Sequence, residues 1–178
     1  MRHIPNFISV IRILLVVPIA LALSHQRLAL SILLFAIAAL SDAADGYLAR
    51  RFGWQSELGG VLDPLADKLL LATALVTLSF LKLVPVWLMV AAVARDVIIV
   101  FGAAAYRMVI GPLTAHPSFI SKVNTLCQAA FILAVVSRAK FSMPPEWGVT
   151  WLGALTFATV VVSGIDYVLV YGKRAVAA

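Results

Sequence analysis

Long apolar stretches separated by short polar connections run along the whole chain. Six of them reach the roughly 20 residues that an α-helix needs to cross the hydrocarbon core of a membrane, most of them only when charged residues are included. They predict helices at 5–24, 28–49, 58–81, 84–108, 118–138 and 148–171. The pattern therefore predicts an all-α fold, a polytopic membrane protein with six transmembrane helices in a single domain that covers residues 1–178.

Composition strengthens the membrane interpretation. The chain has 178 residues, of which 63% are hydrophobic and 12% are charged, whereas soluble domains are close to half apolar and a quarter charged. The single Cys127 lies in an apolar stretch and predicts no disulfide framework. The net charge of +6 suits contact with anionic lipid headgroups, and no basic and aromatic pattern suggests nucleic acid.

The distribution of Lys and Arg over the connections predicts the orientation, because cytoplasmic connections carry the excess of these residues. One side would carry Arg2, Arg50, Arg51, Arg107, Lys173 and Arg174, and the other Arg27, Lys82, Arg138 and Lys140. We therefore expect an integral protein of the inner (cytoplasmic) membrane, with both termini and the acidic segment described next facing the cytoplasm.

Five of the eight acidic residues, four of them aspartates, lie within residues 42–67, between two strongly apolar stretches. Asp42 and Asp45 are three residues apart and Asp63 and Asp67 are four apart, so each pair shares one face of a helix. A polar connection at 51–57 would fold the two helices into a hairpin that brings the pairs together. Four carboxylates in one pocket need compensating cations, and all-oxygen ligands suit Mg²⁺, Mn²⁺ or Ca²⁺.

These acids belong to a longer pattern, D-x-x-D-G-x-x-A-R, then eight residues, then G-x-x-x-D-x-x-x-D. The pattern resembles the signature of the CDP-alcohol phosphatidyltransferases, and the resemblance extends over nearly the whole chain. All the fixed positions of that signature are present: Asp42, Asp45, Gly46, Ala49, Arg50, Gly59, Asp63 and Asp67.

The resemblance implies an enzyme that transfers a phosphatidyl group from CDP-diacylglycerol to an alcohol and releases CMP. It implies two Mg²⁺ or Mn²⁺ ions held by Asp42, Asp45, Asp63 and Asp67, and a homodimer. It also implies that Asp67 is the general base, a role that its position farthest into its helix favours as well. The residues implied to bind the CDP-lipid are Asp42, Gly46, Ala49, Arg50, Gly59 and Asp63.

Other charged residues fall within the predicted helices, all in the halves nearer the cytoplasm. They are Arg12, Lys68, Arg95, Asp96, Lys122 and Asp166. Charges at a similar depth on one side predict a polar cavity that opens to the cytoplasm, in which Arg12, Arg95 and Lys122 would bind phosphates and lipid headgroups. Two alternatives stay open: Arg95 and Asp96 form a buried ion pair that fixes helix packing, and Arg12 reaches the membrane interface.

The acceptor alcohol is predicted from segments outside the signature. The segments HPSFISKVNTLCQ and ARDVIIVFGAAAYR resemble the CMP-forming cardiolipin synthases more closely than the phosphatidylglycerophosphate synthases, which usually carry a G-K-x-K-T element. Here Asn124 stands where the second Lys of that element would be, beside Lys122. One cation fewer suits phosphatidylglycerol, whose phosphate is a monoanionic diester, better than glycerol 3-phosphate, which is a dianion.

Two other functions stay open from the sequence. A phosphatidylglycerophosphate synthase would use the same signature with glycerol 3-phosphate as acceptor. An intramembrane cation transporter would also place carboxylates at depth, but such proteins often show broken helices or an inverted repeat, and the chain shows neither sign.

Overall fold

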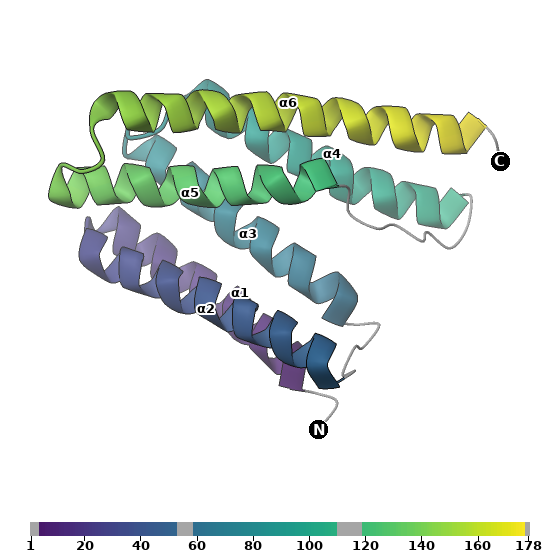
Figure 1. Cartoon of the computed structure of the whole chain (residues 1–178), viewed down its shortest axis with the longest axis horizontal. Coiled ribbons are helices and arrows are strands. Elements are labelled where there is room, and N and C mark those ends of the chain that lie inside the picture. Colours follow the sequence, from purple (N-terminus) through teal and green to yellow (C-terminus); the bar gives the residue numbers. More distant parts are fainter. Residues whose placement is uncertain (1–3, 53–58, 110–118, 177–178) are drawn as a thin grey trace. The chain divides into compact units, whose positions relative to one another are not determined.

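The computed structural model describes the backbone of residues 4–52, 59–109 and 119–176, and the side chains of residues 10–41, 65–102 and 119–169. The described backbone forms six helices and no strands (Figure 1). They are α1 (Ile4–Ser24), α2 (Leu28–Phe52), α3 (Gly59–Phe80), α4 (Val86–Val109), α5 (Phe119–Phe141) and α6 (Glu146–Val176). The all-α prediction and the order of the helices are confirmed.

The helix ends differ most from the prediction where charged residues follow an apolar stretch. The prediction ended the second helix at residue 49 and the last at residue 171, whereas α2 continues to Phe52 and α6 to Val176. Apolar length measures only the membrane-spanning part, and Arg and Lys are good helix formers that let a helix continue beyond it. α6 begins at Glu146 directly after Pro145, and an acidic residue in the first turn favours a helix start.

Three helices are followed, within two residues of their ends, by a residue with left-handed backbone geometry that is not glycine. Gln26, Lys82 and Ser142 have φ angles of 54°, 59° and 59°. After α1, the N–H of Arg27 donates to the carbonyl of Ala22 at 2.8 Å, which satisfies a carbonyl that the helix end would leave unpaired. Each of these residues lies in a short connection: Gln26 between α1 and α2, Lys82 between α3 and α4, and Ser142 between α5 and α6.

The helices gather into two compact units. The first contains α1, α2, α3, the end of α5 from residue 135 and the two residues that follow it, and within it α1 packs against both α2 and α3 (Figure 1). Small residues let these helices approach closely, since Ala22 of α1, Ala38 of α2 and Ala66 of α3 are all buried. Both helices that carry the signature therefore pack on α1.

The second unit contains α4, residues 119–134 of α5, and α6, with α4 packed against α6 (Figure 1). Its buried apolar residues come from all three helices, for example Leu88 from α4, Ile132 from α5 and Val160 from α6. Trp87 of α4 and Phe157 of α6 meet edge to face, with ring centroids 5.1 Å apart.

Apolar residues also cover the outside of the described helices. Leu40 is 70% exposed and Phe80 is 82% exposed, whereas Arg12 and Gln128 are each 1% exposed. Soluble proteins show the opposite arrangement, so polar residues inside and large apolar residues outside indicate a lipid environment.

Length and hydropathy support the same conclusion for part of the chain. Among the described residues, the segments Phe119–Phe141 and Glu146–Leu169 are long and apolar enough to cross a membrane, and Val10–Ser24 and Leu28–Ser41 are shorter apolar helices. Two of the six predicted membrane-spanning helices therefore pass this test of length and composition, and the number of spans stays a prediction.

Gly102 of α4 lies against the side chain of Tyr167 on α6. A Cβ atom placed there would lie 2.8 Å from the hydroxyl oxygen of Tyr167, which donates to the carbonyl of Ile99 at 3.0 Å. We expect Gly102→Ala to displace the tyrosine ring and to lower the stability of the protein by about 1–3 kcal/mol. Thermal unfolding in detergent measures the change.

Gly148→Ala is the matched control for this prediction. A Cβ atom at Gly148 would meet nothing nearer than 3.7 Å, which is an ordinary contact, and alanine favours a helix over glycine. Replacing Tyr167 with Phe in the Gly102→Ala background should recover part of the loss, because the nearest atom is the hydroxyl oxygen. Equal stability of Gly102→Ala and Gly148→Ala would contradict the described packing.

Candidate active site

The eight signature positions lie on two successive helices, as the sequence predicts. α2 carries Asp42, Asp45, Gly46, Ala49 and Arg50, and α3 carries Gly59, Asp63 and Asp67. Of these, only Asp67 belongs to the described side chains, so the predicted convergence of the four carboxylates lies outside the described residues. The two helices are separated only by residues 53–58, which is consistent with a hairpin.

Asp67 is held by a residue of the first helix. The Nη1 atom of Arg12 donates to Oδ1 of Asp67 at 2.5 Å, a charge-assisted hydrogen bond between α1 and α3. Arg12 is almost fully buried, whereas the Asp67 side chain keeps 33% of its surface exposed. The contact fixes the carboxylate while leaving it accessible, which is what a residue that contacts substrate requires.

This contact decides between two interpretations of Arg12. A side chain that is 1% exposed does not reach to the membrane interface. It compensates the charge of Asp67 instead, so an arginine that the sequence assigned to lipid headgroups is in contact with the predicted base.

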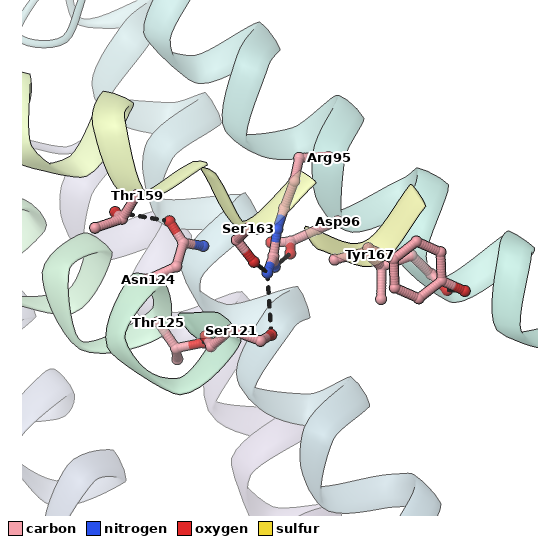
Figure 2. Close-up of polar contacts among 9 residues, drawn as sticks. Arg95, Asp96, Ser121, Asn124, Thr125, Thr159, Ser163 and Tyr167 are labelled. Carbon is pink, nitrogen blue, oxygen red and sulfur yellow. Dashed lines mark hydrogen bonds and ion pairs between the residues drawn. The ribbon is translucent and has the colours of Figure 1, made fainter. Parts of the chain in front are cut away.

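Arg95 is the centre of a second polar cluster, drawn in Figure 2. Its Nη1 atom donates to Oδ1 of the neighbouring Asp96 at 2.6 Å, and its Nη2 atom donates to the hydroxyls of Ser121 on α5, at 3.0 Å, and Ser163 on α6. Arg95 thus joins the three helices of the second unit, and Asp96 balances its charge. The arrangement agrees with the buried ion pair that the sequence left open.

Asn124 and Lys122 do not share a face of α5. They are two residues apart, which turns them to nearly opposite sides of a helix. Asn124 is 1% exposed and its Oδ1 atom accepts a hydrogen bond of 3.1 Å from the Thr159 hydroxyl, while Lys122 is exposed. The structure therefore brings Asn124, but not Lys122, to the side of the Arg95 cluster (Figure 2).

Arg12 and the Arg95 cluster belong to different units. Each is described within its own unit, so the predicted cavity that unites Arg12, Arg95 and Lys122 stays a prediction.

Sequence reasoning missed four polar residues in the second unit: Ser121, Gln128, Thr159 and Ser163. Ser121, Asn124 and Gln128 follow one another at intervals of three and four residues within an apolar helix, and this spacing was the available signal. Thr159 and Ser163 repeat it on α6 with an interval of four. Serine and threonine are common in membrane helices, which explains why the spacing did not stand out.

The carboxylates of the signature have the chemistry of a divalent-metal site, because hard cations such as Mg²⁺ and Mn²⁺ prefer oxygen ligands. No group of three or more His, Cys, Asp or Glu residues gathers among the described side chains, which include Asp67 but not Asp42, Asp45 or Asp63. The donor set fits a metal, and its geometry lies outside the described residues.

Comparison with known proteins agrees with the signature. Residues 2–165 match the family described as CDP-alcohol phosphatidyltransferase, and the chain belongs to this family. The family generally depends on metal ions and acts in phospholipid synthesis with CDP-diacylglycerol as substrate. Together with the apolar helices, this membership indicates a membrane protein.

Individual relatives carry two different names. The chain is 32% identical to a human cardiolipin synthase (CMP-forming), over 97% of this chain and 62% of that protein. It is 31% identical to a probable phosphatidylglycerophosphate synthase of Mycobacterium tuberculosis, over 93% of this chain and 80% of that protein. A CDP-diacylglycerol–glycerol-3-phosphate 3-phosphatidyltransferase of Bacillus subtilis is 34% identical over 64% of this chain and 56% of that protein.

These identities are too similar to separate the two activities. The chain also spans only 62% of the length of the human protein. The comparisons therefore establish the family, and the acceptor has to be argued from the chain itself.

Proposed function

We propose that the protein transfers the phosphatidyl group of CDP-diacylglycerol to phosphatidylglycerol, giving cardiolipin and CMP. The observation that carries the reaction class is the complete signature on α2 and α3, with its last carboxylate, Asp67, held by Arg12. The acceptor hydroxyl oxygen forms a bond to the β-phosphorus, the bond from that phosphorus to the CMP oxygen breaks, and the hydroxyl proton passes to Asp67.

The remaining signature residues would bind the nucleotide end of the lipid. Asp42, Asp45 and Asp63 would hold the metal ions, together with Asp67, and bound divalent ions neutralise charge on the phosphates during transfer. Gly46, Ala49 and Gly59 are small enough for the phosphates to approach the backbone closely, and Arg50 would pair with a phosphate oxygen. We propose two Mg²⁺ or Mn²⁺ ions as the cofactor.

Arg12 would act as a positioning residue for the base. Its hydrogen bond aligns the Asp67 carboxylate from the α1 side, and a base has to lie within hydrogen-bond distance of the proton that it removes.

The balance of charge around Asn124 supports phosphatidylglycerol as the acceptor. On α4, Asp96 compensates the positive charge of the Arg95 guanidinium. On α5, the buried polar residue Asn124 is neutral. A dianionic phosphomonoester in these surroundings would lack a matching pair of cations, and unpaired buried charge is costly. A neutral glycerol end has no such requirement.

Competition between acceptors tests this choice. With CDP-diacylglycerol and equal concentrations of phosphatidylglycerol and glycerol 3-phosphate, we expect cardiolipin to exceed phosphatidylglycerophosphate about tenfold or more, because one missing charge-assisted hydrogen bond costs about 1.5–3 kcal/mol. Mass spectrometry of the lipid products measures the ratio. Phosphatidylglycerophosphate as the main product would favour the second candidate function.

That second candidate is a phosphatidylglycerophosphate synthase. It is favoured by the relative of that name from Mycobacterium tuberculosis, of which the chain covers 80%, against 62% of the human cardiolipin synthase.

We further propose that the whole chain is one domain whose six helices span the inner membrane around a polar cavity open to the cytoplasm. The family match over residues 2–165 and the apolar outer surface of the described helices support this proposal. The Arg and Lys residues around the acidic segment support an active site on the cytoplasmic side. The homodimer is proposed by analogy with the family alone.

A further inference from the structure

The first unit carries exposed cations at the end that lies away from the signature. Figure 1 shows α1 and α3 running in the same direction, and Arg12 of α1 contacts Asp67 of α3. Arg27 lies fifteen positions after Arg12, and Lys82 lies fifteen positions after Asp67. Both cations therefore lie at one end of the unit, about 20 Å along the helices from the contact between Arg12 and Asp67.

A third cation joins this end from α5. Lys140 lies in the last turn of α5, in the part of that helix that belongs to the first unit, and Figure 1 shows this part on the same side as the connection after α1. We call Arg27, Lys82 and Lys140 the basic end of the first unit, and all three side chains are exposed. The acidic residues of this unit all fall within residues 42–67, and the next one along the chain, Glu146, belongs to the second unit.

The surroundings of the basic end distinguish it from an ordinary solvated surface. Cations near the C-terminus of a helix stabilise it through the helix dipole, but this role requires no apolar neighbours. Each cation here has a large exposed apolar residue within three positions: Leu30, Phe80 and Phe141 are 40%, 82% and 61% exposed. Cations at the edge of an apolar outer surface are typical of residues at the level of lipid headgroups.

We propose that the basic end binds the headgroup phosphate of an anionic phospholipid in the membrane leaflet opposite the signature. A phosphodiester carries one negative charge and oxygen atoms that Arg and Lys donors bind, and the acyl chains of the same lipid suit the exposed apolar residues beside the cations. This lipid is not a substrate, because it lies at the end of the helices away from Asp67. The inference rests on the proposed membrane-spanning arrangement and is independent of the acceptor alcohol.

The probe is phosphatidylmethanol, an anionic phospholipid without a free hydroxyl, which therefore cannot accept a phosphatidyl group. Native mass spectrometry of the purified protein, without CDP-diacylglycerol or metal, measures the Kd of this lipid and of zwitterionic phosphatidylcholine. For the wild-type protein we expect the Kd of phosphatidylmethanol to be about 30-fold lower, because each cation near an anionic headgroup contributes about threefold or more. The difference should shrink as ammonium acetate is raised, because salt screens exposed charges.

A combined variant removes the three charges: Arg27→Gln, Lys82→Asn and Lys140→Gln. Asparagine suits residue 82, where the φ angle is 59°. We expect the Kd of phosphatidylmethanol to rise about 30-fold in this variant and the Kd of phosphatidylcholine to stay unchanged. The matched control keeps the charges by combining Arg27→Lys, Lys82→Arg and Lys140→Arg, and it should bind both lipids like the wild type.

Three results would overturn the proposal. A wild-type Kd for phosphatidylmethanol in the combined neutral variant would mean that the lipid binds elsewhere. An equal loss of binding in the charge-retaining control would mean that the three residues act through the fold and not through their charge. If the combined variant does not fold, the three single variants are measured instead, and unchanged Kd values in all of them refute the proposal. Failure of every preparation to release CMP would overturn the proposed function and leave the lipid measurements valid.

Discussion

Removal of divalent cations should abolish turnover, and Mg²⁺ or Mn²⁺ should restore it. Four of the eight acidic residues belong to one signature on two successive helices, and if the four carboxylates share one pocket, as we propose, they need bound cations to stay ionised together. Phosphoryl transfer also depends on cations that neutralise the phosphate oxygens. The assay is CMP release after treatment with EDTA and after back-titration with each metal.

The control measures whether the protein stays folded after the metal has been removed. Circular dichroism and thermal unfolding should show that EDTA leaves the helices folded, so that lost activity reports on the site. Full activity after exhaustive chelation would contradict the assignment of Asp42, Asp45, Asp63 and Asp67 as metal ligands.

Asp67→Asn should lower turnover by about 10²- to 10⁴-fold, the usual effect of losing a general base. Asparagine keeps the shape of the side chain and an oxygen that accepts the hydrogen bond from Arg12. Binding of CDP-diacylglycerol should persist, because Asp42, Asp45 and Asp63 remain. Turnover and nucleotide-lipid binding are measured on the same preparation.

Glu146→Gln provides the matched control for the lost charge. Glu146 lies in the first turn of α6 and outside the signature, so this variant should keep wild-type turnover. Loss of CDP-diacylglycerol binding in Asp67→Asn would mean that Asp67 is chiefly a metal ligand. Wild-type turnover in Asp67→Asn would remove Asp67 from the reaction altogether.

The fold was predictable because apolar length determines where a membrane helix lies. The backbone geometry of the connections was not predictable from the sequence. Gln26, Lys82 and Ser142 adopt the left-handed geometry that a sequence normally signals with glycine. After α1, this geometry accompanies a hydrogen bond from the N–H of Arg27 to the carbonyl of Ala22, which the sequence does not signal.

The signature was predictable because its chemistry depends on residues that are close in sequence. The partner of Asp67 was not, because Arg12 is 55 positions away and meets it only when α1 packs on α3. The same holds for Arg95, whose partners Ser121 and Ser163 lie on two other helices. Sequence spacing finds residues on one helix face, and packing between helices decides which faces meet.

Coupled release of CMP and transfer of the phosphatidyl group tests the central claim most directly. Purified protein in detergent receives CDP-diacylglycerol, Mg²⁺ and phosphatidylglycerol, and both products are quantified by mass. The account predicts equal amounts of CMP and cardiolipin, with neither formed when phosphatidylglycerol is left out. Failure to release CMP with phosphatidylglycerol and with glycerol 3-phosphate, by a protein that is folded and supplied with metal, would contradict the account.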